Sequence, residues 1–495
     1  MSVSKIVVLM LENRSFDHML GLRPGVIGLL APDGSIDPKH ANPIDPSKPG
    51  SKKYQVTADA PYAVDPEDVY KDGTTTYGGP SHSFPSTTEQ LTGSTTGAVG
   101  RDAPHSGFVK SYYDVLVHSA HRANPSDAEI RLPMQAFGRD RLPVLWTLAD
   151  EFVVCDSWFS AMPGPTQPNR LFVHAATSAG FAHNVWSHPI EADTIYDRLD
   201  EKNKTWGMFY HDMKDSDSFP QLKKRTDRIL PFASFLALAS DGRLPQYTFV
   251  CPRYNDAPEG RANSQHAPED VRDGENLIAD VYESLRKSPD WGTTLLVVTY
   301  DEHGGFYDHV TPPAAAAPDD SVSPTAFDRQ EAARSSRNQY LLAPDYQFRF
   351  DRLGLRVPAI LVSPLVGRGT VDSTPYDHTS ILATVRDVFG TRPLTKRDAA
   401  SKSFAGQLGG PARKDCPEKL PRPTLSEAEK NEVAMQSDLA RPPSAPQREM
   451  WPALAHLDGH PDSGKVTAPP ATRGQAAQYI KERVDAHNDK HRRRQ

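Results

Sequence analysis

The sequence has little cysteine, no long hydrophobic run and no strongly basic region before its extreme C-terminus. Its three cysteines, Cys155, Cys251 and Cys416, form no CxxC pair, which argues against a disulfide framework or a thiolate metal site. No stretch approaches the roughly 20 apolar residues that a transmembrane helix requires. The net charge of −7 provides no electrostatic footprint for nucleic acid, so we expect no nucleic-acid partner.

The N-terminus, MSVSKIVVLMLEN, lacks the hydrophobic length and the small-residue cleavage site of a signal peptide. We therefore expect a protein that is cytoplasmic or is exported by a signal-independent route. At 495 residues, the chain exceeds the size of a single core. We expect one large α/β domain over residues 1–408 and a Pro-rich polar extension over residues 409–495. The extension is either disordered or packs near the site mouth or on a neighbouring subunit, which would then make a homo-oligomer.

The most informative stretch is 293–310, TTLLVVTYDEHGGFYDHV. Its apolar first half is typical of a strand that is buried on both faces, as in a parallel sheet. Ligands of α/β proteins bind beyond the carboxyl ends of such strands, where Asp301 and Glu302 fall. Gly304 and Gly305 would let the backbone turn sharply there. Adjacent buried carboxylates favour a bound cation, whereas a solvated loop with surface acids is the alternative.

A second buried strand is predicted over Ile6–Leu11, and it is followed directly by Glu12 and Asn13. These two side chains are candidates for metal ligands at the same sheet edge. The alternative is a capped strand-to-helix turn that uses Asn13 or Ser15.

Thr166 lies in a Pro-rich turn before a helix predicted over Asn169–Thr177. A hydroxyl at a helix N-terminus is placed well for attack on a phosphate, although a helix cap is the ordinary interpretation. Three histidines, His82, His211 and His266, lie in loops or beside aromatic residues. His378 is a candidate ligand or a residue at the start of a helix, and we favour the structural interpretation.

Several other segments complete the predicted architecture. Residues 30–130 are expected to form an excursion over the carboxyl edge of the sheet, residues 191–290 a layer of helices and loops, and residues 314–345 a lid-like insertion. Further strands are predicted at Glu151–Cys155, in YTFVCPRYND and in RVPAILVSPLV, and an amphipathic helix with a stripe from Val271 to Leu285.

Taken together, six motifs in one order resemble the bacterial phosphoesterase family that contains the non-haemolytic phospholipases C and the respiratory-burst-inhibiting acid phosphatases. The resemblance covers most of residues 3–408. The motifs are IVVLMLENRSFDHMLG, GPTQPNR, HAPEDVRDGENLIADVY, TYDEHGGFYDHVTPP, GLRVPAILVSP and YDHTSILATVRDVFG.

The resemblance implies an alkaline-phosphatase-like α/β core, with a mostly parallel central sheet sandwiched by helices, and a metal-dependent covalent mechanism. Glu12 and Asn13 match the first metal-binding pair of the family, and Asp301 and Glu302 match the second. Thr166 matches a nucleophile that also touches the metal. The imidazoles around the phosphoryl group match His82, His211 and His266. The cofactor would be one divalent metal ion, and the oxygen and nitrogen ligands leave Zn, Ca, Mn and Fe open.

Threonine as the nucleophile resembles the phospholipase C branch, which usually carries a twin-arginine export signal that this chain lacks. The expected activity is hydrolysis of phosphatidylcholine or phosphatidylethanolamine to diacylglycerol and a phosphorylated head group. The expected partners are a phospholipid substrate and, transiently, a membrane surface. A broad acid phosphatase and a non-catalytic metal-binding protein are the alternatives. An aromatic cage for a quaternary ammonium would draw on Trp158, Phe159, Tyr210 and Tyr254.

Overall fold

The structure is a computed structural model. It describes residues 2–64, 79–95, 99–100, 103–119, 122–184, 189–256, 260–318 and 348–424.

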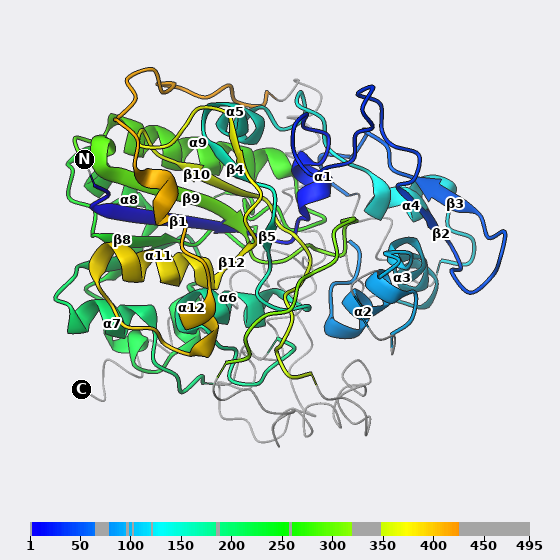
Figure 1. Ribbon diagram of the computed structural model, residues 1–495, viewed down its shortest axis with the longest axis horizontal. Coiled ribbons are helices and arrows are strands. Elements are labelled where there is room, and N and C mark those ends of the chain that lie inside the picture. Colours follow the sequence, from blue (N-terminus) through cyan, green and yellow to red (C-terminus); the bar gives the residue numbers. More distant parts are fainter. Residues whose placement is uncertain are drawn as a thin grey trace.

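An eight-stranded sheet forms the centre of the molecule, and seven of its strands run parallel (Figure 1). Only β10 runs antiparallel, to both of its neighbours. In spatial order the strands are β11 (Thr370–Asp372), β4 (Val153–Cys155), β10 (Ala359–Val362), β9 (Thr294–Tyr300), β1 (Lys5–Leu11), β8 (Tyr247–Val250), β6 (Trp206–Tyr210) and β7 (Ile229–Pro231). The predicted α/β fold with a mostly parallel sheet is confirmed.

Helices cover both faces of this sheet (Figure 1). One layer contains α5 (Pro143–Glu151), α8 (Phe232–Ser240) and α9 (Val271–Lys287), and the other contains α6 (Thr166–Ala175), α7 (Ile195–Glu201) and α11 (Thr379–Phe389). The apolar stripe predicted for the long helix is buried in α9. A short ribbon of β5 (Trp158–Phe159) and β12 (Tyr376–Asp377) and the helix α12 (Lys396–Ala400) complete this domain.

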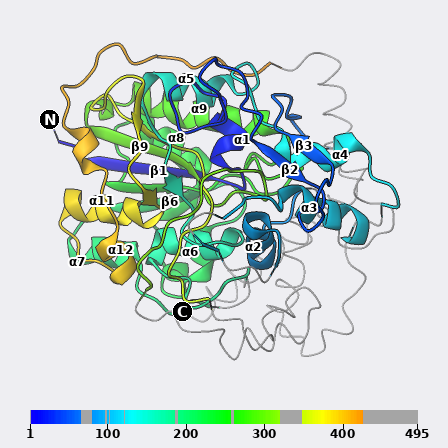
Figure 2. The ribbon, with the colours of Figure 1, turned by 45° about the vertical axis from the view of Figure 1, so that its right-hand side comes forward.

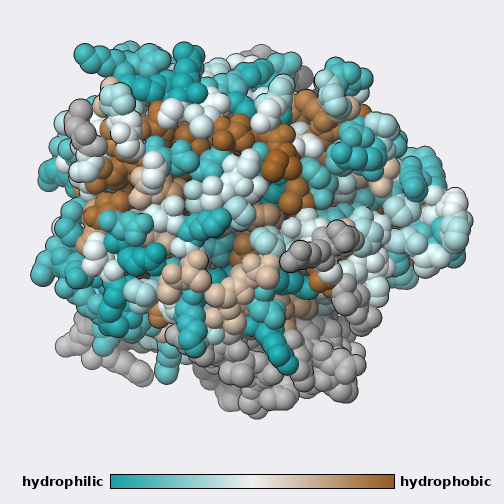
Figure 3. Space-filling model, viewed as in Figure 1, coloured by the Kyte–Doolittle hydropathy of each residue, from teal (hydrophilic) through white to brown (hydrophobic). Residues whose placement is uncertain are grey.

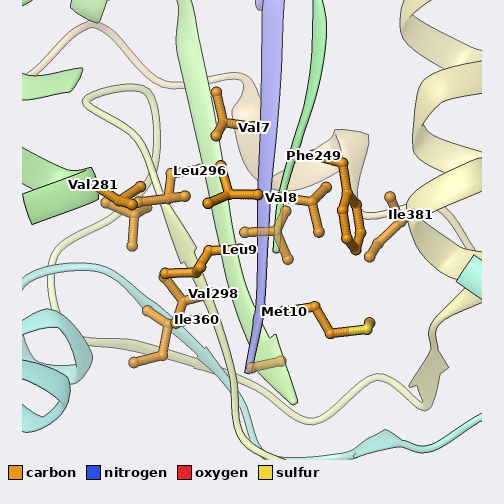
Figure 4. Close-up of a cluster of buried hydrophobic side chains, with 14 of the residues drawn as sticks. Val7, Val8, Leu9, Met10, Phe249, Val281, Leu296, Val298, Ile360 and Ile381 are labelled. Carbon is orange, nitrogen blue, oxygen red and sulfur yellow. The ribbon is translucent and has the colours of Figure 1, made fainter. Parts of the chain in front are cut away.

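The central strands β1 and β9 are buried on both faces, which explains why their sequences show no polar alternation. Along β1, alternate side chains point in opposite directions (Figure 4). Leu9 lies on the side of Val281 from α9. Val8 lies on the other side, with Phe249 of β8 and Ile381 of α11. The two helix layers therefore form one continuous core through the sheet.

The excursion predicted over residues 30–130 is confirmed and lies beyond the carboxyl ends of the strands (Figures 1 and 2). With the residues just before it, it contains α1 (Phe16–Leu20), β2 (Ala41–Pro43), β3 (Lys53–Gln55), α2 (Phe84–Thr92), α3 (Phe108–Asp114) and α4 (Asp127–Arg131). It has its own apolar cluster, to which the loop after β9 contributes Phe306 and Tyr307. Apolar packing thus fixes the excursion to that loop.

Three sequence predictions differ from the structure. Glu151 is the last residue of α5, and the strand predicted from Glu151 begins only at Val153. The helix expected from Asn169 begins at Thr166, since prolines are tolerated in a first turn. Residues 191–290 contribute the predicted strand β8 and also two strands that were not predicted, β6 and β7. These two strands are short, and β7 lies at the edge of the sheet, so their sequence signal is weak.

The described part of the extension, residues 409–424, packs on the same chain. Arg413 binds Glu151 at the end of α5, and Tyr282 of α9 donates to the Pro417 carbonyl at 2.6 Å. Cys416 and Leu420 are buried there. Residues 425–495, and residues 319–345 of the predicted lid, lie outside the described residues.

Hydrophilic residues cover much of the face shown in Figure 3, with smaller hydrophobic areas between them. Among the described residues, Ile27 and Leu236 are the large hydrophobic side chains classed as exposed. No helix in the described ranges is both long enough and apolar enough to cross a membrane.

Truncation of a side chain in the central strand tests this view of the core. Leu296→Ala should lower the free energy of unfolding by about 2–5 kcal/mol, because a fully buried leucine would leave a cavity. Leu236→Ala, at an exposed position of α8, is the matched control and should change it by less than about 0.5 kcal/mol. Urea unfolding followed by circular dichroism measures both. Equal losses for the two variants would contradict the assignment of β9 to the core.

Candidate active site

The two acidic segments meet because β1 and β9 are parallel neighbours in register. Leu11 pairs with Tyr300, and the Asp301 amide donates to the Leu11 carbonyl at 3.2 Å. Glu12 and Asp301 therefore leave the sheet side by side. Both carboxyl groups and that of Glu302 are buried.

Asn13 holds this corner together through both its backbone and its side chain. Its amide N–H donates to Asp301 Oδ1 at 3.0 Å, and its φ of 57° is in the left-handed region. Asparagine tolerates this region better than most residues other than glycine. A Cβ on Gly304 would lie 2.0 Å from the Asn13 carbonyl oxygen, so the loop after β9 can approach Asn13 only as glycine.

Thr166 is the first residue of α6, and Pro165 occupies the cap position, so Thr166 is not a helix cap. Its side chain is buried, with 5% exposure, and its hydroxyl donates to Asn13 Oδ1 at 3.3 Å. The helix thus presents Thr166 directly to the corner formed by β1 and β9.

His82 and His266 lie on the opposite side of Asn13, with ring centroids 5.6 Å apart. They line a small pocket, partly open to solvent, together with Asn13, Gly79, Pro80, Ala267 and Gly304. His82 Nδ1 faces the Pro80 carbonyl at 3.2 Å and must donate to it. In neutral His82, Nε2 then accepts from Asn13 Nδ2 at 3.1 Å, which leaves Asn13 Oδ1 to accept from Thr166.

His266 has a matching arrangement. Its Nδ1 contacts the Ala267 carbonyl and therefore carries the proton. Burial, assisted by the neighbouring His82, lowers the pKa of His266 to about 3. His266 is therefore neutral near pH 7, with a lone pair on Nε2.

His211 is not brought into this group. It follows β6, stacks on Phe232 with centroids 4.3 Å apart and faces the Cys251 carbonyl through Nδ1 at 3.1 Å. Burial lowers its pKa to about 4. These contacts indicate a packing role for His211 in the described structure.

His378 is structural, as predicted, but it acts beside the site. Trp158 Nε1 donates to its Nδ1 at 3.3 Å, so its Nε2 donates to the Asp301 carbonyl at 2.6 Å.

Trp158 and Phe159 are core residues, and Tyr254 packs under Arg170 at 5.1 Å. Lys214 lies over the ring of Tyr210 at 5.3 Å. The four candidates for an aromatic cage therefore have other contacts.

Burial makes negative charge costly at this site. It raises the pKa of Glu12 well above the ordinary value and that of Asp301 to about 6, although Arg170 opposes both shifts. Arg170 Nε lies 3.1 Å from Asp301 Oδ2 and 3.8 Å from Glu12 Oε1. The carboxylates are thus only partly neutralised by the protein.

The donor set fits a hard divalent cation. Asn13 contacts Asp301 through its backbone and Thr166 through its side chain, and the acids Glu12 and Glu302 lie next to them at the ends of β1 and β9. Within the described ranges, no three His, Cys, Asp or Glu side chains are arranged to hold a metal ion by themselves. A cation here would therefore depend on the Asn13 amide and the Thr166 hydroxyl as well as on carboxylates.

Sequence reasoning missed the residues that support these ligands. Arg170 lies in the GPTQPNR motif, one helical turn after Thr166, and that spacing was its only signal. His303 lies between Glu302 Oε2, at 3.2 Å, and Gln90 Oε1, at 2.7 Å. Asp215 comes from a short 3₁₀ helix, Asp215–Ser218, with no recognisable pattern.

A buried ionic network fixes the loop after β9. Arg356 binds Asp17 at 2.8 Å and Asp308 at 2.9 Å, and Asp17 also binds His309 Nδ1 at 2.6 Å. The network joins α1, the Gly304–Gly305 loop and the segment before β10. It therefore fixes the path of the chain on both sides of the acidic pair.

Curated relatives resemble most of this chain. A non-specific phospholipase C1 from Arabidopsis thaliana is 36% identical over 448 residues, which are 86% of this chain and 74% of that protein. A non-hemolytic phospholipase C from Burkholderia pseudomallei is 26% identical over 441 residues, 79% of this chain and 55% of that protein. Among solved structures, an alkaline phosphatase superfamily protein from Vibrio parahaemolyticus has 15% identity and a TM-score of 0.31, covering 53% of this chain and 64% of that one.

The family model and the curated relatives define the enzyme class of this chain, a hydrolase that acts on phosphoric ester bonds. The model of the Phosphoesterase family matches residues 3–392, a range that contains every site residue described above. The chain belongs to the Phosphoesterase family.

The close approach of Gly304 to Asn13 can be tested by adding one methyl group. Gly304→Ala should lower kcat for a phosphoester by ~100-fold or more, because a shift of about 1 Å at Asn13 disturbs its contact with Thr166. Gly406→Ala is the control, since its Cβ would meet no atom within 4 Å. Hydrolysis of p-nitrophenyl phosphate measures both variants. Wild-type activity of folded Gly304→Ala would contradict the described geometry.

The Asp17–His309 pair predicts a pH dependence of stability. Burial opposes both shifts, but His309 and Arg356 lower the pKa of Asp17 to about 2, and Asp17 raises the pKa of His309. The contribution of His309 to the free energy of unfolding is fully present below the pKa of unfolded histidine, ~6.5, and is lost as pH rises through the raised pKa of the folded state. The contribution of Asp17 to the same free energy is present above about pH 4 and is lost as pH falls toward 2.

His309→Gln should therefore flatten the fall in unfolding free energy between about pH 6.5 and pH 9. Asp17→Asn should remove the same slope, since both contributions depend on one ion pair. Urea unfolding across this pH range measures it. An unchanged slope in both variants would rule out the pair as its source.

Proposed function

We propose that this protein is a phospholipase C that hydrolyses phosphatidylcholine-type or phosphatidylethanolamine-type lipids. The names of the plant and bacterial relatives support the reaction class. The observation that carries the mechanism is the contact of the Thr166 hydroxyl with Asn13, beside the buried acids at the ends of β1 and β9. A buried hydroxyl at the N-terminus of a helix lies at the positive end of the helix dipole. That end stabilises negative charge on an attacking oxygen and on a bound phosphate.

The residues that would hold the divalent cation are Glu12, Asn13, Thr166, Asp301 and Glu302. When bound, such a cation supplies Lewis acidity toward the phosphoryl oxygens and lowers the pKa of a hydroxyl that it contacts. The chemistry of the oxygen donors supports Zn, Ca, Mn or Fe without selecting among them.

In the first step, Thr166 Oγ attacks phosphorus and the bond from phosphorus to the glycerol oxygen breaks. A neutral histidine, His82 or His266, accepts the Thr166 proton and passes it to the departing alkoxide, which leaves as diacylglycerol. The product on the enzyme is a phosphodiester between Thr166 and the head group. The lone pair on Nε2 of neutral His266 supports His266 in this role.

In the second step, water takes the place of the alcohol. The same histidine removes a proton from water, the hydroxide attacks phosphorus, and Thr166 Oγ leaves and recovers the proton. The phosphorylated head group is released and the enzyme returns to its starting state. Splitting the displacement in this way replaces one difficult step by two easier ones.

The nucleophile can be tested with one matched pair of variants. Thr166→Ala should reduce phosphocholine release from phosphatidylcholine vesicles by ~1,000-fold or more, because no phospho-enzyme can form. Thr147→Ala removes a hydroxyl that only bonds the Pro143 carbonyl within α5, and should retain full activity. Chelation should abolish wild-type activity, and added cation should restore it.

Parallel assays with p-nitrophenyl phosphate separate the alternatives. Turnover of the monoester without phosphocholine release would make the protein a phosphomonoesterase with the same nucleophile. Retained cation with no turnover of either ester would indicate a non-catalytic metal-binding protein. Phosphocholine release by Thr166→Ala at the wild-type rate would exclude Thr166 as nucleophile.

A further inference from the structure

Arg170 connects the nucleophile's helix to both acidic strand ends. Its side chain is only 3% exposed and uses all three guanidinium nitrogens. Nε donates to Asp301 Oδ2 at 3.1 Å, and Nη2 donates to the carbonyl oxygens of Met10 and Leu11 at 3.2 and 3.1 Å. One planar group thus joins α6, the end of β1 and the residue after β9.

Asp215 holds this guanidinium from the other side. Its Oδ2 accepts from Arg170 Nη1 at 3.2 Å and contacts His174 Nε2 at 3.1 Å, while its Oδ1 accepts from the Tyr254 hydroxyl at 3.1 Å. The Tyr254 ring packs against the guanidinium at 5.1 Å, and Tyr196 contacts His174 Nδ1 at 3.1 Å. Asp215 itself is 8% exposed, and the three side chains that it contacts, Arg170, His174 and Tyr254, are neither proposed metal ligands nor catalytic groups.

We propose that Asp215 is a positioning residue that acts through Arg170 and thereby fixes Thr166 relative to Asp301 and the cation that this site would hold. The inference rests on the proposed function, because it assigns Asp215 and Arg170 a place in the same reaction.

Geometry explains why an arginine is needed. Its fork reaches a carboxylate on each side and two backbone carbonyls at once, whereas a lysine ammonium is a single point charge. Because the fork is planar and every arm is bonded, a shift of α6 along the strand ends would break several bonds together. Thr166, one turn earlier on α6, is therefore tied to the acidic pair rather than to the helix layer alone.

The test compares Asp215→Asn with Arg198→Gln in the full-length protein. Asp215→Asn should lower kcat and the affinity for Mn²⁺ by roughly 10- to 100-fold, the usual effect of a lost supporting partner, with KM for the ester unchanged. Arg198 is the control, since it is an equally buried arginine of α7 that binds Asp193 and Glu201 away from the site. Arg198→Gln should leave kcat, KM and Mn²⁺ affinity at wild-type values.

A double variant separates positioning from simple loss of stability. If Asp215 acts through Arg170, then Asp215→Asn with Arg170→Gln should be no slower than Arg170→Gln alone. Arg170→Lys should not restore kcat, because its single head group cannot make the three sets of contacts. The proposal would be wrong if the losses of kcat in the two single variants multiply in the double variant, or if Arg170→Lys has the kcat of the wild type.

The experiments distinguish a failure of the positioning role of Asp215 from a failure of the proposed function. Hydrogen exchange of residues 166–170 reads the anchoring of α6 without turnover, and it should speed up in Asp215→Asn but not in Arg198→Gln. If hydrogen exchange, Mn²⁺ affinity and kcat are all unchanged in Asp215→Asn, the positioning role of Asp215 is wrong, but the protein can still be a phospholipase C. If the wild-type protein hydrolyses no phosphoester, the proposed function is wrong. Faster hydrogen exchange in Asp215→Asn would even then support the anchoring of α6 by Asp215 and Arg170.

Discussion

The structure depends on one constraint, the burial of several carboxylates at the adjacent ends of two parallel strands. Register alone brings Glu12 beside Asp301, and Glu302 follows directly. Such a concentration of negative charge away from water is unfavourable unless cations share the space. Arg170 supplies one positive charge, while burial still raises the pKa of Glu12 and of Asp301. The divalent cation proposed above would supply further positive charge to this set.

Backbone geometry, rather than side-chain chemistry alone, allows the acids to meet the nucleophile. Asn13 adopts a left-handed conformation so that its amide N–H faces Asp301 while its side chain faces Thr166. Gly304 passes close to its carbonyl group, where any side chain would collide. The buried Arg356 network and the apolar cluster of the excursion fix the chain on either side of this turn.

Much of the fold and the centre of the site could be predicted from the sequence. The apolar runs of β1 and β9 identify strands buried on both faces, and the acids that follow them identify the sheet edge. The antiparallel direction of β10 and the strands β6 and β7 were not predicted, because strand direction and edge position are set by tertiary packing. Asp215 was missed for a related reason, since its role exists only once α6 and β1 have been brought together.

The division between strand ends and loops also bears on substrate selection. The acids, Asn13 and Thr166 occupy positions fixed by the sheet and by α6, whereas His82 and His266 belong to the excursion and to the loop after β8. Aromatic residues beside the strands, such as Trp158 and Tyr254, are engaged by His378 and Arg170. In the described structure, the pocket wall that faces away from the strand ends therefore consists of loop residues. Changes in those loops alter what the pocket admits without disturbing the register that gathers the reacting groups.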